Sequence, residues 1–85
     1  MILVSMYDKK ARAFFKPFTS ATHDTAIREL TVLARNPESD LSKYPDDFDA
    51  VVVGEFSEVH GVLTPCAHVI LSIPRVPAKL EVARG

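Results

Sequence analysis

Basic and aromatic residues alternate in one short stretch of the N-terminal half. Between positions 9 and 18 four cations are interleaved with three rings, in the order Lys9, Lys10, Arg12, Phe14, Phe15, Lys16 and Phe18. Sites for single-stranded nucleic acid combine cations that follow the phosphates with rings on which bases stack. The stretch therefore predicts a nucleic-acid contact. The structural alternative sends one of the two adjacent phenylalanines into the core and leaves the lysines to solubilise the chain or protect a sheet edge.

Two arginines extend this basic set along an expected helix. Arg28 and Arg35 are seven residues apart, so they share one helix face and can extend a basic surface toward phosphates. The alternative is that both solubilise the helix, with Arg35 also favoured at the C-terminal end of the dipole. Arg28 is kept as a candidate, so the predicted nucleic-acid-binding residues are Lys9, Lys10, Arg12, Phe14, Phe15, Lys16 and Arg28.

The residues suited to metal binding or nucleophilic catalysis are too few to form a site. Cys66 and His68 share a strand face, but a four-ligand zinc site would also need His60 and His23. Cys66 has no evident carboxylate to orient a histidine base, so the expected role of its side chain is that of a small buried hydrophobe. We expect no metal, no cofactor and no enzymatic activity.

Carboxylates gather in the middle of the chain. The sequence around Asp40, Asp46, Asp47 and Asp49 lacks the glycine and the terminal glutamate of an EF-hand. The cluster is typical of a solvated face, and it can also mimic or repel DNA or engage a basic partner.

Turn and breaker residues divide the chain into four strands and one helix. Apolar residues at helical spacing predict a helix over residues 23–35, which Thr22 or Asp24 can cap and Pro37 ends. Runs rich in β-branched and aromatic residues, interrupted at Pro17 and Pro65, predict strands over 2–7, 12–18, 48–56 and 62–73. The order predicts an α+β fold, a small antiparallel β-sheet (ββαββ) with one α-helix packed on one face.

Two residues predict special backbone geometry. Asp8 stands where the first strand enters a turn, and its carboxylate can accept hydrogen bonds from the turn backbone. Gly54 lies inside a strand, which indicates a bulge or a close approach of another backbone.

Composition places the chain among small folded proteins. Its 85 residues predict a single domain over 1–85, in which proline keeps residues 74–85 as an extended C-terminal tail. The chain is 47% hydrophobic and 25% charged, with a net charge of −1. This near-neutral total conceals an uneven distribution: residues 1–35 carry +3, residues 36–61 carry −6 and residues 62–85 carry +2. One cysteine suits a reducing cytosol, and we expect neither a signal peptide nor a membrane span.

Six short strings occur in an order and spacing that resemble a known family. They cover residues 6–61 and read MYDKKA (6–11), PF (17–18), AIR (26–28), NPES (36–39), KYPDDF (43–48) and GEF (54–56) followed by Gly61. The chain resembles the nonstructural protein of the microviruses, best known from the gokushovirus branch. Ser57-Glu58 replaces the usual acidic pair, and none of the strings lies beyond Gly61, so the last 24 residues carry no inference.

The resemblance implies a nonstructural bacteriophage protein of the host cytoplasm that is not a virion component. It implies a role in single-stranded DNA synthesis or binding, and it carries over no catalytic residue. Two hypotheses follow: a weak single-stranded DNA-binding accessory of viral genome replication, or an interaction and regulatory module that does not contact DNA. Because the core is small, we also expect a homodimer or higher homo-oligomer, and a phage or host replication protein is a further candidate partner.

Overall fold

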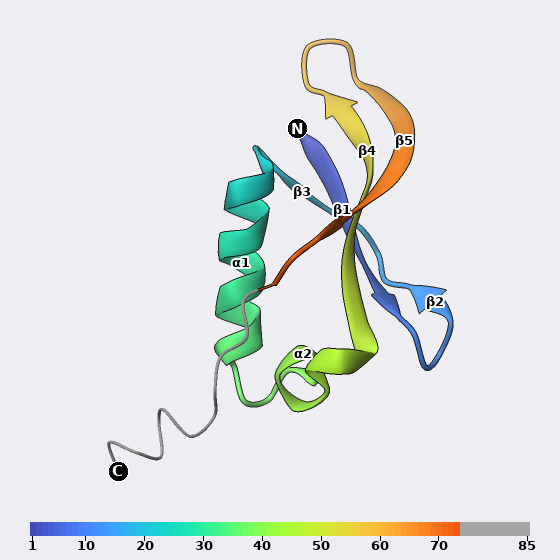
Figure 1. Ribbon diagram of the computed structural model, residues 1–85. Helices are drawn as coiled ribbons and strands as arrows, with labels where there is room; N and C mark the ends of the chain where they lie inside the picture. Colours follow the sequence, from blue (N-terminus) through green and yellow to red (C-terminus); the bar gives the residue numbers. More distant parts are fainter. Residues whose placement is uncertain (74–85) are drawn as a thin grey trace.

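The protein is a curled antiparallel sheet with one long helix across one face (Figure 1). The computed structural model describes residues 1–73, so the predicted tail from residue 74 lies outside the described residues. The elements are β1 (Ile2–Asp8), β2 (Ala13–Phe14), β3 (Phe18–Ser20), α1 (His23–Arg35), α2 (Asp40–Lys43), η1 (Pro45–Asp47), β4 (Phe48–Ser57) and β5 (Val62–Leu71). The predicted α+β class with an antiparallel sheet and one main helix is confirmed, although the sheet has five strands within residues 1–73 rather than the four expected.

The predicted helix begins at its expected cap. Thr22 Oγ1 accepts a hydrogen bond from Thr25 N at 3.1 Å, and Thr25 Oγ1 accepts one from Thr22 N at 2.9 Å. This reciprocal pair satisfies two donors that every helix N-terminus leaves without partners. Asn36 ends the helix, as the following proline predicts.

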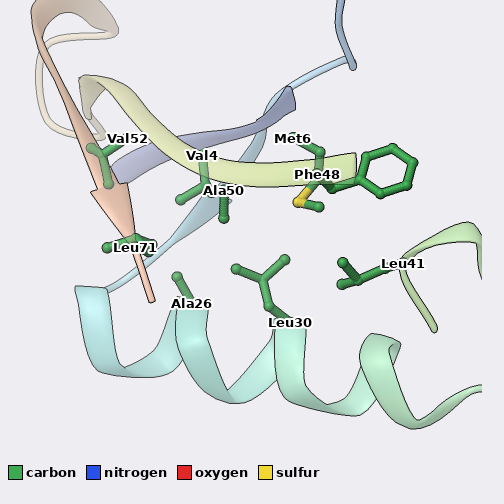
Figure 2. Close-up of a cluster of buried hydrophobic side chains, with 9 residues drawn as sticks. All are labelled: Val4, Met6, Ala26, Leu30, Leu41, Phe48, Ala50, Val52 and Leu71. Atoms are coloured by element: carbon green, nitrogen blue, oxygen red, sulfur yellow. The ribbon is translucent and has the colours of Figure 1, made fainter. Parts of the chain in front are cut away.

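The hydrophobic core lies between α1 and the sheet. Ala26 and Leu30 point from α1 toward β1, β4 and β5 (Figure 2). The cluster consists of Val4, Met6, Ala26, Leu30, Leu41, Phe48, Ala50, Val52 and Leu71. Leu33, which the helical spacing placed beside this face, is 40% exposed. The core is therefore built from every second residue of the central strands β1 and β4 and one narrow stripe of α1, with Leu41 of α2 and Leu71 of β5 completing it.

Two segments are more divided than the sequence predicted. The expected single strand over 12–18 is split into β2 and β3, because Pro17 has no N–H to donate and residues 15–17 leave the regular ladder. Backbone contact with β1 persists there, since Phe15 N donates to Met6 O at 2.8 Å. The expected polar loop over 38–47 holds α2 and η1, and Ser39 Oγ caps α2 by accepting from Ser42 N at 3.1 Å.

The sheet bends at the middle of β4. The β1 register changes between Leu3–Gly54 and Val4–Val52, which leaves Val53 as an extra residue in β4. The β5 register changes at the same place, between Val52–Val69 and Gly54–Pro65. A Cβ on Gly54 would meet Thr64 O at 2.7 Å, so the predicted close approach at this glycine is confirmed. Bulges bend strands and increase their twist, so this point starts the curl of the sheet.

A candidate nucleic-acid interface

The turn after β1 presents its cations through a tightly fixed backbone. Asp8 Oδ1 accepts hydrogen bonds from Lys10 N at 2.9 Å and from Ala11 N at 3.1 Å, as predicted. Arg12 N donates to Asp8 O at 2.7 Å. Arg12 adopts a φ of 59°, the left-handed region that favours glycine or asparagine. Arg12 therefore occupies a position whose backbone conformation is unfavourable for a residue with a long side chain.

Six of the seven predicted site residues lie together in this turn, in β2 and in the two residues after β2. We call residues 9–16 the basic hairpin; every one of them is exposed. Lys9 Nζ lies 3.5 Å from Asp49 Oδ1 in a solvent-exposed pair, and Lys9 N donates to Asp47 O. The acidic residues around Asp47 and Asp49 therefore lie beside the basic hairpin. Within residues 1–73, the side chains of Lys10, Arg12 and Lys16 form no ion pair.

The two adjacent phenylalanines contact different aromatic partners, and neither is buried. Phe14 packs on Tyr7, with ring centroids 4.6 Å apart, and is 49% exposed. Phe15 meets the edge of the core residue Phe48 at 5.8 Å and is 48% exposed. The sequence expectation of one core ring and one outward ring is therefore replaced by two half-exposed rings. Each retains surface on which another planar group can stack.

Arg28 does not join the basic hairpin. It is an exposed residue of α1, and Figure 1 shows α1 well separated from β2. Its predicted contribution to a basic surface would therefore require a ligand that reaches around the sheet.

The sheet curls over the face opposite α1. In the strand order β2-β1-β4-β5, a flat sheet would hold β2 and β5 about 14 Å apart. Yet the rings of Phe14 on β2 and His68 on β5 meet at 5.7 Å, edge to face. Ser5 and Val51 alternate along their strands with core residues, so their side chains face away from α1, yet both residues are buried. This second face is therefore partly enclosed.

A hollow of about 230 Å³ remains inside this curl. Its lining residues are Ser5, Phe14, Phe15, Pro17, Val53 and His68. The Ser5 hydroxyl donates to Phe15 O at 2.6 Å, so it is already satisfied. Sequence reasoning missed Val53 and His68 as neighbours of the basic hairpin. The only available signal was Gly54, which marks the bend but not the direction of the curl.

The described residues show neither a metal cluster nor a membrane-spanning helix. No group of three or more histidine, cysteine, aspartate or glutamate side chains within residues 1–73 is arranged to hold a metal ion. Cys66 is exposed rather than buried as predicted, because β5 is the last strand of the sheet order; its Sγ lies 3.8 Å from Val52 O. None of the helices in this part of the chain is long and apolar enough to cross a membrane.

These features define a class of small α+β protein whose exposed cations and aromatic rings share one hairpin. The chain belongs to the Phage ORF5 protein family, whose model matches residues 1–75. It is 32% identical over 77 residues to Protein ORF5 of Chlamydia phage 1, an alignment that covers 86% of this chain and 80% of that protein. No solved structure matches the chain. The predicted resemblance to a protein of the gokushovirus type is confirmed.

Proposed function

We propose that this phage protein is a weak, non-enzymatic single-stranded DNA-binding accessory of viral genome replication, acting in the host cytoplasm rather than in the virion. The observation that carries the proposal is the basic hairpin, where Phe14 and Phe15 are both half exposed among four cations. Rings in such positions contribute stacking to any base, while the cations contact phosphates. A duplex hides its base faces, so this combination favours single strands.

The proposed binding is weak because the local charge is partly offset. The whole chain carries −1, so no long-range field draws a polyanion to it. Lys9 is already beside Asp49, which leaves Lys10, Arg12 and Lys16 as the cations most available to phosphates. Their contacts release counterions, so the affinity falls steeply as salt rises.

Matched charge variants test this proposal. We would measure the fluorescence anisotropy of a labelled thymidine oligonucleotide at low salt with Lys10→Gln/Lys16→Gln and with Arg35→Gln/Lys43→Gln. Both variants lower the net charge by the same amount, but only the first changes the basic hairpin. A specific loss of affinity in the first variant supports the proposal. Equal losses of affinity in the two variants would mean that binding depends on overall charge alone. No loss in either variant would mean that DNA binds elsewhere on the protein.

A second candidate function is protein interaction without DNA, and β5 favours it. Within the described residues β5 pairs only with β4, so its other edge is open. Leu63 and Ile70 on β5 are 64% and 65% exposed, and residues 59–74 include no charged side chain. Long apolar edges are normally protected by charges, so an uncharged one suits a partner strand.

The partner proposed for this edge is a second copy of the chain. Two identical β5 strands can pair antiparallel about a two-fold axis without bringing like charges together. DNA titration separates the two functions: a protein that self-associates through β5 but binds no single strand at low salt would be an interaction module.

A further inference from the structure

We infer that the hollow beside the basic hairpin accepts one unpaired nucleobase of the bound strand, held against Phe14 and His68. This inference rests on the proposed function and assigns it a specific base site. The inference arises from the curl of the sheet, which brings His68 of β5 into contact with Phe14 of β2, 54 positions away in the sequence.

The size of the hollow suits a small ring system. Its volume is about 230 Å³, below the range of about 300–1,000 Å³ typical of pockets for drug-sized ligands. A single planar ring system fits this space better than a larger cofactor does. Val53 and Ser5 belong to the central strands at its floor, and Phe15 and Pro17 come from the irregular segment between β2 and β3.

The chemistry of the lining favours a ring over an ion. The walls are apolar or aromatic, and the one serine hydroxyl is engaged with Phe15 O. The imidazole of His68 is the remaining polar group and meets Phe14 edge to face. An anion alone would gain no charged partner from the side chains that line the hollow.

The cations near the hollow are the reason to expect that this ring belongs to a nucleic acid, whose phosphates are negatively charged. Lys16 lies in sequence between two residues of the lining, Phe15 and Pro17. Arg12 and Lys10 lie in the turn that leads into β2. A base in the hollow therefore has its own phosphates next to cations that form no ion pair within residues 1–73, so stacking and phosphate contact act on the same nucleotide.

The bulge at Val53 makes this arrangement possible. In a regular sheet β5 would continue away from β2, and His68 would have no contact with Phe14. Because the registers of both β1 and β5 shift beside Val53, the sheet bends at the floor of the hollow itself. Bulges commonly redirect side chains toward a site in this way.

An abasic oligonucleotide tests the base site separately from phosphate binding. We would compare a thymidine strand with an abasic strand of equal length and charge by fluorescence anisotropy. The unmodified protein should prefer the thymidine strand by about 5- to 150-fold, the factor expected for one stacked base. Val53→Phe fills the hollow and should remove most of this preference while leaving the salt dependence unchanged. Val59→Phe, the same substitution in the exposed β4–β5 turn, should keep it.

A second variant guards against a folding defect in Val53→Phe. His68 is exposed, so His68→Ala should leave the fold intact and still lower the preference several-fold. If both hollow variants keep the full preference for thymidine, the hollow is not the base site, although the hairpin can still bind DNA. If the unmodified protein binds neither strand at low salt, the proposed function fails, and this inference fails with it.

Discussion

Arg12 is a position where DNA binding and stability are expected to conflict. Its φ of 59° costs a residue with a Cβ about 1–2 kcal/mol relative to a right-handed conformation. Glycine avoids this cost but has more conformational entropy to lose, worth about 0.5–1 kcal/mol. The middle of these two ranges therefore predicts that Arg12→Gly raises the free energy of unfolding by about 0.5–1 kcal/mol. For a domain of this size, that corresponds to an increase in Tm of about 2–8 °C.

The same substitution should weaken DNA binding. It removes one of the three hairpin cations that have no ion pair within the described residues. The log–log salt dependence of the affinity for a single strand should become shallower by about 0.7, the contribution of one phosphate contact. Thermal denaturation followed by circular dichroism gives the first quantity, and anisotropy at several salt concentrations gives the second.

Lys10→Gly is the matched control for Arg12→Gly. It removes a cation from the same turn, but Lys10 has no positive φ. We expect it to weaken DNA binding to a similar extent without a gain in stability. An Arg12→Gly protein that is less stable than the original would refute the backbone argument. One that binds DNA with unchanged affinity and salt dependence would refute the role of Arg12 in binding.

Three further predictions concern the framework and its open edge. Leu30→Ala should cost about 2–5 kcal/mol in urea unfolding because Leu30 is almost fully buried against the sheet; a cost well below this range would contradict its place in the core. Gly54→Ala should cost about 1–3 kcal/mol because its Cβ would collide with Thr64 O, and an unchanged stability would argue against the close β4–β5 approach. Ile70→Lys should shift sedimentation from dimer to monomer with stability altered by no more than about 0.5 kcal/mol, and a persistent dimer would exclude β5 as the interface.

The parts of the fold governed by local chemistry were predictable from the sequence. The spacing of Ile27 and Leu30, the Thr22 cap and the stop at Pro37 together set the bounds of α1. The Asp8 turn and the close approach at Gly54 were also predicted, because each depends on a single residue type. Local rules were enough for these elements.

The features that depend on the curl of the sheet were not predictable. Pro17 marked the interruption that separates β2 from β3, but Phe14 and Phe15 were expected to divide between core and solvent. Both are half exposed because β2 and the irregular segment after it lie at the edge of the sheet. The contact between Phe14 and His68 depends on register shifts in two pairs of strands; Gly54 marks where the sheet bends, but no residue signals the direction of the curl. The hollow, and the approach of β5 to the basic hairpin, are therefore visible only in three dimensions.

The most direct test of the central claim is a salt titration of single-stranded DNA binding by the unmodified protein. Affinity for a labelled thymidine oligonucleotide would be measured by anisotropy from low to physiological salt. If Lys9, Lys10, Arg12 and Lys16 all contact phosphates, the log–log slope should be about −3. A slope near −2 would mean that Lys9 stays with Asp49. Absence of binding at the lowest salt, or an affinity that does not change with salt, would contradict the account.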